Sequence, residues 1–433
     1  MTTARARSAH AATSRIGGRA VGAVCAQGSQ ALASLALQVL AARALGIEGL
    51  GAFALLYGVI VFLTGFSTGF VGDSLTVLDR GARRVRSALQ GWALIIAVGS
   101  ASAAAVVLAA TGFVSATDAA LFAVAAVVFL LEDVIRRTLM AVMRFWKIVA
   151  TDLTSLAVSV LVLGVIAGMR PLTLGDFLAA LALGQFAALA AGAALLPRSE
   201  RRLVALVGGG YAAVARYGVW RAAQQAVRPG LLAATRTLVF AVIGLAATGQ
   251  LEAARIYASP TLLFIGGLSS FLFASFALAK EEDLRALRRR ADTGVVALFA
   301  ATILIGGVSI LLIPWIGALV TGHALDLPTV IAWMIYAGSV AAVTPYGALA
   351  AVRGRQVGVF VVRLSDSLVS LALAALSLWA GGALWTVPIA LAVGSIAGGA
   401  VIRLVLLRTT APPRRVDAPE PALVSQGRLG ASS

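Results

Sequence analysis

Cysteine and histidine are scarce in this chain of 433 residues, and their scarcity excludes whole classes of protein. The single cysteine, Cys25, excludes an internal disulfide framework and a cysteine-based metal site. The two histidines, His10 and His323, are expected in the N-terminal tail and in a loop. No metal site or catalytic triad can be assembled around them. We therefore expect no metal, no cofactor and no catalytic residue.

Charged residues are also few, at 12%, whereas a soluble protein carries about a quarter. Hydrophobic residues make up 60% of the chain, and the mean hydropathy is +0.96. A soluble protein of this size could not bury so much apolar surface, so the chain is predicted to be an all-α integral membrane protein. Its net charge of +17 comes almost entirely from arginine in short connections, which does not indicate a nucleic-acid partner.

Apolar windows of about 20 residues, long enough to cross a bilayer as helices, recur about twelve times. The first run is too long for a typical cleavable signal peptide and is interpreted as a signal anchor. The predicted spans lie near 20–41, 51–72, 88–112, 119–140, 149–168, 174–196, 217–246, 253–278, 292–320, 328–350, 357–380 and 384–406.

Basic residues alternate between the connections and so predict the orientation. About 28 Lys and Arg residues fall on one side and about three on the other, and the rich side is expected to be cytoplasmic. Both termini then lie in the cytoplasm. No connection is long enough for a folded extramembrane domain, and residues 411–433, rich in Pro, Ala and Ser, are predicted to be a disordered tail.

A weak internal repeat divides the chain into two halves. Four residues recur at a displacement of about 200, each block ending an odd-numbered span and opening the next. The pairs are Gly49 and Gly249, Ala54 and Ala254, Tyr57 and Tyr257, and Leu63 and Leu263. We expect two six-helix lobes, 1–205 and 206–410, that meet at a central cavity.

Stretch 217–249 (YGVWRAAQQAVRPGLLAATRTLVFAVIGLAATG) is long enough to cross a bilayer yet carries three arginines. On a helix its polar side chains fall within an arc of roughly 120°. They are Arg221, Gln224, Gln225, Arg228 and Arg236. An arginine at mid-bilayer costs several kcal/mol, so this face is predicted to line a water-filled cavity that receives an anion, beside a bend at Pro229. Alternatively, Arg221 and Arg236 reach opposite interfaces and only Arg228 lies within the membrane.

The first span has a polar stripe of its own. Gln27, Gln30, Ser34 and Gln38 lie within about 80° of one another on a helix. We expect the stripe to face the arginine-bearing span across the central cavity and its glutamines to contact substrate. Hydrogen bonding between helices is the alternative.

Further charges lie in predicted spans. Glu132/Arg136 and Asp133/Arg137 are spaced i,i+4, Asp152 opens the fifth span, and Arg363/Asp366 are spaced i,i+3. We assign Glu132, Asp133, Asp152, Arg363 and Asp366 to a cytoplasmic gate or to ion coupling. Anchoring of helix ends at the interface is the alternative, and it is favoured for Arg136 and Arg137.

Three stretches carry a family resemblance. LQVLAARALGIEGLGAFALLYGVI (37–60) resembles the first hairpin of polysaccharide (O-antigen type) flippases. GLAATGQLEAARIYASPTLLF (244–264) is similar to the start of their second half, and RRTLMAVMRFWKIVATDL (136–153) resembles the end of their fourth span. These proteins belong to the multidrug/oligosaccharidyl-lipid/polysaccharide exporter superfamily.

The resemblance implies a two-lobed, V-shaped bundle of helices with a basic central cavity, and a flippase in the cytoplasmic membrane of a bacterium. It would move undecaprenyl-diphosphate-linked sugars by alternating access, generally coupled to an ion gradient. The implied partners are the lipid-linked sugar, membrane lipids, and the glycosyltransferases and polymerase of the same pathway. The chain departs from the drug-exporting branch in having no clear acidic residue at mid-depth of the first span.

Two other transporter classes stay open. A drug/cation antiporter of the same superfamily is one. A major-facilitator transporter is the other, because Asp79–Arg84 partly resembles the arginine-rich loop of that family, with Leu75 and Ala82 in place of two of its glycines. A membrane enzyme such as a sugar polymerase generally needs a sizeable outer loop, and the sequence predicts none.

Overall fold

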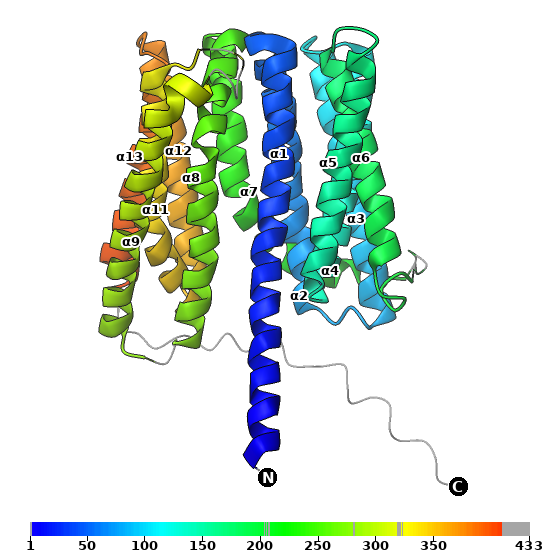
Figure 1. Cartoon of the computed structure of the whole chain (residues 1–433), viewed down its shortest axis with the longest axis vertical. Coiled ribbons are helices and arrows are strands. Elements are labelled where there is room, and N and C mark those ends of the chain that lie inside the picture. Colours follow the sequence, from blue (N-terminus) through cyan, green and yellow to red (C-terminus); the bar gives the residue numbers. More distant parts are fainter. Residues whose placement is uncertain are drawn as a thin grey trace.

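Figure 1 shows the computed structural model, in which long helices run side by side in two groups with α1 between them. The structure describes residues 2–408 apart from 203, 205, 207, 280, 281, 318–321 and 323, so the predicted tail 411–433 lies outside the described residues. Within that part no strand occurs. The elements are α1 (Thr2–Ser67), η1 (Thr68–Gly72), α2 (Asp73–Val77), α3 (Arg83–Ala110), α4 (Ala116–Ala141), α5 (Phe145–Ala167), α6 (Leu174–Leu195), α7 (Tyr211–Val242), α8 (Leu245–Leu278), α9 (Leu284–Leu312), η2 (Ile313–Gly317), α11 (Leu327–Val352), α12 (Gln356–Trp379), α13 (Thr386–Val401) and η3 (Ile402–Leu406).

Helix α1 is a hairpin of two arms. At Gly46 the backbone leaves the helical region with φ of 71°, a conformation that glycine adopts without strain. The hydroxyls of Ser34 and Tyr57 are hydrogen-bonded at 2.7 Å. In a straight helix these residues would be about 35 Å apart, so the chain must reverse between them. The arms 2–45 and 47–67 therefore correspond to the first two predicted spans.

The two arms, with α3–α9 and α11–α13, make twelve membrane-length helices among the described residues, as the sequence predicts. By length and composition alone, eight described segments could cross a membrane, and one of them contains both arms of α1. The remaining three helices are α4, α7 and α8, which carry Glu132, Arg236 and Glu252 as buried charges.

Each group of helices has a hydrophobic core, and the core of the first extends to Ala253 and Ile256 of α8. In the first lobe Phe53, Phe122 and Phe177 are buried together, and in the second Trp333 and Leu391 belong to a separate cluster. The lobes meet where α1 packs on α8. A Cβ at Gly249 would lie 1.8 Å from the carbonyl oxygen of Ile47, so the two backbones touch there. The exact lobe boundary and the V shape stay predictions.

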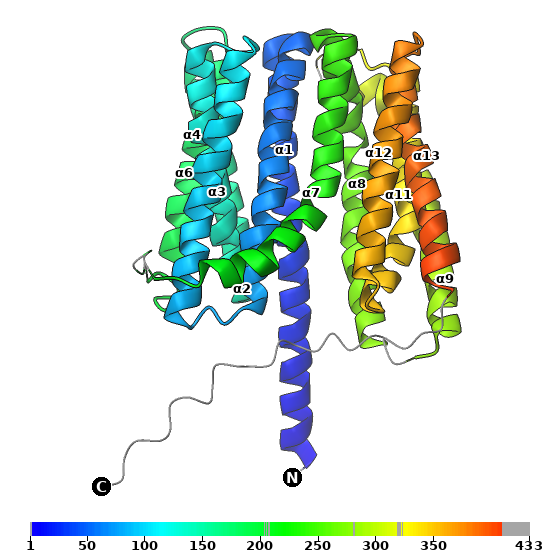
Figure 2. The same cartoon turned by 180° about the vertical axis from the view of Figure 1, so that it is seen from behind.

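Helix α7 changes direction along its length, as the proline at 229 predicts. Its first part, residues 211–228, runs obliquely between the lobes, and we call it the crossing arm (Figure 2). At one end the indole of Trp92 donates a hydrogen bond to the carbonyl of Tyr211 at 3.1 Å. Further along, the rings of Trp220 and Phe360 on α12 meet edge to face at 4.8 Å. The arm thus links the two lobes at one end of the bundle.

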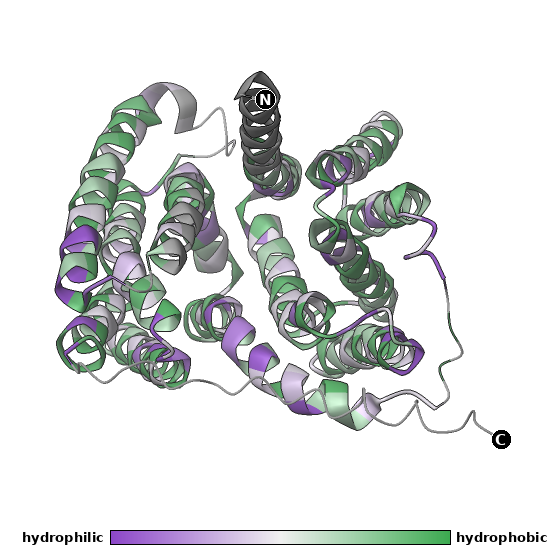
Figure 3. Cartoon of the chain, turned by 90° about the horizontal axis from the view of Figure 1, so that it is seen from below, coloured by the Kyte–Doolittle hydropathy of each residue, from purple (hydrophilic) through white to green (hydrophobic). Residues whose placement is uncertain are grey.

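That end also carries the arginine-rich connections, and we call it the basic side. Arg80 and Arg86 both contact Glu200, at 3.1 and 3.5 Å, which joins the connection before α3 to the one after α6. Figure 3 views the molecule from this side and shows hydrophilic positions along the oblique crossing arm. The basic side is the one that the sequence predicts to be cytoplasmic.

Candidate functional site

A buried ion cluster joins the two lobes. Arg236 of α7 and Arg255 of α8 share the carboxylate of Glu252, with Nε to carboxylate oxygen distances of 3.0 and 2.9 Å. Arg255 also donates a hydrogen bond of 2.8 Å to the side-chain oxygen of Gln38 on α1. Arg236 lies directly against the second arm of α1, since a Cβ at Gly58 would be 2.8 Å from its Nη1. We call these four polar residues, Gln38, Arg236, Glu252 and Arg255, the central ion cluster.

The central ion cluster has more positive than negative charge. Arg236 is 8% exposed and Glu252 is 2% exposed, so solvent screens them little. A buried charge is costly unless it is paired and hydrogen-bonded. One carboxylate neutralises only one of the two guanidiniums. The arrangement therefore favours a second anion near the boundary between the lobes.

Arg221 lies in a different group, on the crossing arm. Its guanidinium pairs with Asp73 of α2 at 2.6 Å and donates a hydrogen bond of 2.8 Å to Gln224. Gln225 donates to the same carboxylate at 3.4 Å, and Arg228 is exposed. The structure does not bring Arg221 and Arg236 together, because they lie about 22 Å apart along α7 and pair with different carboxylates, Asp73 and Glu252. Contact of these side chains with a common substrate stays a prediction.

The polar stripe of the first span is likewise divided. Gln38 belongs to the central ion cluster, whereas Gln30 and Ser34 line a cavity inside the first lobe. Gln27 is exposed. The stripe therefore does not face α7 along its whole length, since one helix with a polar face contacts different neighbours at different heights.

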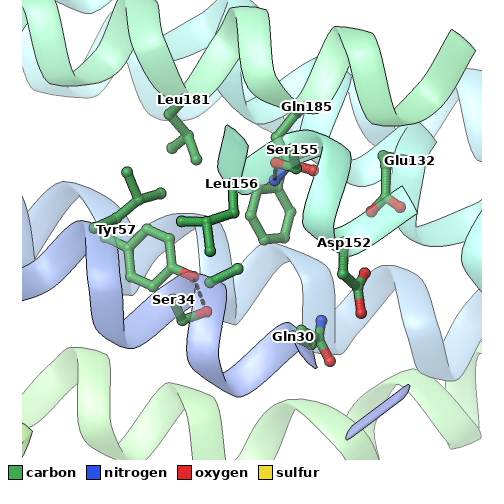
Figure 4. Close-up of a pocket in the computed structure, with 12 residues that line it drawn as sticks. Gln30, Ser34, Tyr57, Glu132, Asp152, Ser155, Leu156, Leu181 and Gln185 are labelled. Carbon is green, nitrogen blue, oxygen red and sulfur yellow. Dashed lines mark hydrogen bonds between the residues drawn. The ribbon is translucent and has the colours of Figure 1, made fainter. Parts of the chain in front are cut away.

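The first-lobe cavity has a volume of about 30 Å³, room for one or two water molecules or an ion. Its polar lining comes from α1, α4, α5 and α6, and Figure 4 shows Glu132 and Asp152 near each other on one side of it. Within the described residues the carboxylate of Glu132 forms no hydrogen bond or ion pair, and the side-chain oxygen of Gln185 is buried without a partner. The polar residues that line the cavity are Gln30, Ser34, Tyr57, Glu132, Asp152, Ser155 and Gln185.

The pairing predicted for Arg136 is wrong. Instead of Glu132 it pairs with Asp152 of α5 at 3.4 Å and donates a hydrogen bond of 2.7 Å to the carbonyl of Ala26. At 1% exposure Arg136 is not an interfacial anchor either. The cause is tertiary: α5 brings a carboxylate to the buried face of α4, and Ser29 hydrogen-bonds the same carboxylate at 2.6 Å.

Two locally predicted pairs are confirmed. Asp133 and Arg137 are 3.4 Å apart, and Asp133 also accepts a hydrogen bond from Thr68 at 2.8 Å. Arg363 and Asp366 are 3.2 Å apart on α12. Each of these carboxylates thus has a basic partner in its own helix, so a role in a gate between lobes stays a prediction.

Sequence reasoning missed Glu252 and Arg255 as site residues. Both lie in or beside the predicted connection between spans 217–246 and 253–278, although their i,i+3 spacing is a signal for a pair. It also missed Asp73, the partner of Arg221, and Gln185, whose side-chain oxygen is buried. Among the described residues no group of three or more His, Cys, Asp or Glu is placed to hold a metal ion.

Comparison with known proteins shows which proteins share this fold. No family model matches the chain, and no curated protein matches it by sequence. The solved structures that resemble it include an inward-facing multidrug resistance MATE transporter of the MOP superfamily, with a TM-score of 0.64 and 14% identity over 88% of this chain and 96% of that one. The chain has the fold of the MATE transporters.

Two other solved structures support the same fold. An outward-facing MATE transporter of the MOP superfamily has a TM-score of 0.64 and 13% identity, over 89% of this chain and 94% of that one. A MOP superfamily transporter from Pyrococcus furiosus is described as having a binding pocket of reverse polarity. It has a TM-score of 0.63 and 13% identity, over 90% of this chain and 95% of that one. The inward- and outward-facing forms thus match this chain equally well.

Proposed function

We propose that this protein is a transporter of the MOP superfamily that moves a polyprenyl-diphosphate-linked oligosaccharide across the membrane by alternating access. It would act in the cytoplasmic membrane of a bacterium, with both termini in the cytoplasm. The glycosyltransferases and polymerase that build and extend the same glycan are its proposed partners. This is the polysaccharide flippase branch that the sequence resembles.

The excess positive charge of the central ion cluster carries this proposal. Arg236 and Arg255 share one carboxylate at the meeting of the lobes, so a diphosphate could take the second position. Arginine suits this role because its planar guanidinium binds phosphate oxygens in pairs and stays charged. A lipid-linked sugar also needs apolar surface for its chain, and many apolar side chains are exposed on these helices.

Ion coupling is proposed for the first-lobe cavity. Glu132 has no partner among the described residues, and a buried carboxylate without one favours uptake of a proton or a cation. Asp152 lines the same cavity but is already paired with Arg136. We therefore expect Glu132→Gln to abolish the dependence of transport on a proton or sodium gradient while leaving the fold intact.

The test is a flipping assay in proteoliposomes with a fluorescent diphosphate-linked oligosaccharide. Loss of one charge-assisted contact costs about 1.5–3 kcal/mol, so Arg236→Ala and Arg255→Ala should slow transport about tenfold or more. Arg236→Lys keeps the charge but loses the paired geometry and should restore only part of the rate. Arg228→Ala, on the exposed part of α7, tests the wider arginine face predicted from sequence.

Arg289→Ala is the matched control, because this arginine is exposed on the basic side and away from the cluster. Each variant is used only after its thermal unfolding in detergent is shown to match the parent. If Arg236→Ala, Arg255→Ala and Arg228→Ala each flip the lipid at the parental rate, these arginines do not bind the substrate.

A drug/cation antiporter is the second candidate. The acidic first-lobe cavity favours it, since Glu132 and Asp152 could bind the coupling ion there, and the similar solved structures include multidrug resistance transporters. In this case lipophilic cations, and not a diphosphate-linked sugar, would be moved against an imposed ion gradient. The two substrates can be compared in the same proteoliposomes, with Glu132→Gln as the uncoupled control.

A further inference from the structure

The crossing arm forms a second cavity, separate from the central ion cluster, at the basic side. It has a volume of about 510 Å³ and lies between the arm and the start of α12. We call it the crossing-arm pocket. Its lining residues are Arg216, Tyr217, Trp220, Arg221 and Gln356.

The pocket has a net positive charge. Arg221 is neutralised by Asp73 at 2.6 Å, whereas Arg216 is exposed and forms no ion pair within the described residues. Two guanidiniums and one carboxylate leave a single positive charge. That charge matches an anion with one negative charge, such as a phosphate diester.

The surroundings of the pocket favour a lipid over a soluble anion. Trp220 is 40% exposed, and Val219 beside it is more exposed still, so the arm presents apolar surface next to its arginines. A helix with arginine and tryptophan side by side is typical of the membrane interface, where the ring meets acyl chains and the cation meets phosphate. Gln356 adds an amide from the opposite lobe.

We infer that the crossing-arm pocket binds the phosphate-diester headgroup of an anionic membrane phospholipid between Arg216 and Arg221. The bound lipid contacts the crossing arm and α12 together. Since the arm packs on the first lobe through Trp92 and η1, the lipid links the two lobes at the basic side. This inference does not depend on which molecule the protein transports.

Anchoring by general positive charge is the competing explanation, because arginines on this side are expected in any membrane protein. The two explanations differ in the residues on which lipid binding depends. General attraction is shared by all basic-side arginines, whereas binding in the pocket depends on Arg216 and Arg221. The charge balance offers a sharper distinction. Arg216→Gln should weaken lipid binding, and Asp73→Asn should strengthen it by leaving Arg221 unneutralised.

The experiment reconstitutes the full chain in vesicles and measures quenching of Trp220 by brominated phosphatidylglycerol or brominated phosphatidylcholine. The signal of Trp220 is isolated by subtracting that of a Trp220→Phe variant. Because each basic residue near the surface contributes about 1 kcal/mol toward anionic lipid, Arg216→Gln should lower the preference for phosphatidylglycerol about fivefold. Asp73→Asn should raise it by a similar factor, and Arg289→Gln, the matched control, should leave it unchanged.

Three outcomes would overturn the inference. One is equal quenching by the two lipids in the parent protein. Another is an equal loss in Arg216→Gln and Arg289→Gln, which would indicate general attraction. In the third, millimolar inorganic phosphate abolishes the preference, and the pocket then binds a soluble anion. Opposite shifts in Arg216→Gln and Asp73→Asn, insensitive to inorganic phosphate, would support it.

Discussion

Buried charged residues in this protein differ in whether their charge is balanced. Asp152 and Arg136 neutralise each other, and Asp133 has both Arg137 and Thr68. Glu132 has no partner among the described residues, and the central ion cluster has one cation in excess. Balanced pairs can be satisfied by the fold alone. A position with an unbalanced charge can be neutralised by a ligand, a proton or an ion. We therefore propose functional roles for Glu132 and the central ion cluster.

Substitution of Glu252 by glutamine should destabilise the fold strongly, because it leaves Arg236 and Arg255 buried without a counter-charge. Breaking a buried ion pair in this way costs about 3–5 kcal/mol, to be measured as a fall in unfolding free energy in detergent. Glu282→Gln is the control. Glu282 and Arg290 are also paired, at 3.1 Å, but their side chains are 41% and 55% exposed, so the loss should be at most about 1 kcal/mol. Equal losses in the two variants would mean that the central ion cluster is well solvated.

Among the helices, α7 has an unusual role because it belongs to both lobes. Its crossing arm touches the first lobe through closely packed backbones: a Cβ at Gly69 would lie 2.4 Å from the carbonyl oxygen of Arg221. In the same contact, a Cβ at Gly218 of the arm would lie 2.8 Å from the carbonyl oxygen of Phe70 in η1. Small residues permit such close approach of helices in membranes. The position of the arm, and with it the crossing-arm pocket, therefore depends on these glycines.

Gly69→Ala should push the crossing arm away from η1. The contact is with backbone, which cannot move aside as a flexible side chain would, so a cost of about 1–3 kcal/mol in stability is expected. Gly164→Ala in α5 is the control: its Cβ would meet nothing within 4 Å, and alanine is favoured over glycine inside a helix. A thermal unfolding series in detergent should show a lower midpoint for Gly69→Ala and an unchanged or higher one for Gly164→Ala. The reverse order would contradict this packing.

For the molecule as a whole, the two lobes meet along the second arm of α1, which packs against α7 and α8 through Gly51, Gly58 and Gly65. The α1–α8 contact lies toward the end opposite the basic side, and the crossing arm links the lobes at the basic side. The proposed alternating access requires two such lobes, since rigid lobes must move relative to each other. The central ion cluster and the arm are among the inter-lobe contacts that such a movement would have to change.

The orientation of the molecule in the membrane can be tested with single cysteines. In a Cys25→Ser background, Arg289→Cys on the basic side should react with an impermeant maleimide only in inverted vesicles. Trp379→Cys, at the exposed far end of α12, should react only in right-side-out vesicles. Gln38→Cys, buried in the central ion cluster, should react in neither. Labelling of Arg289→Cys in right-side-out vesicles would reverse the predicted topology.

The sequence alone determined the membrane character, the twelve helices and the arginine-rich side, because each follows from composition or from local hydropathy. It also determined Asp133–Arg137 and Arg363–Asp366, whose partners are one helical turn apart, and the change of direction in α7, which a proline imposes. Such features depend on neighbours in the chain, so periodicity is sufficient to find them.

Only the tertiary structure decided which distant groups meet. Arg136 could not be assigned to Asp152, nor Arg255 to Gln38, because each partner lies on another helix and depends on how that helix is rotated and packed. The sequence predicts the bend of α7 at Pro229, but it could not show that Arg221 and Arg236 pair with Asp73 and Glu252, which lie on other helices and place the two arginines in separate groups. Helical periodicity gives the direction of a side chain about the axis of its helix. The neighbours that the side chain meets are set by the packing of the other helices.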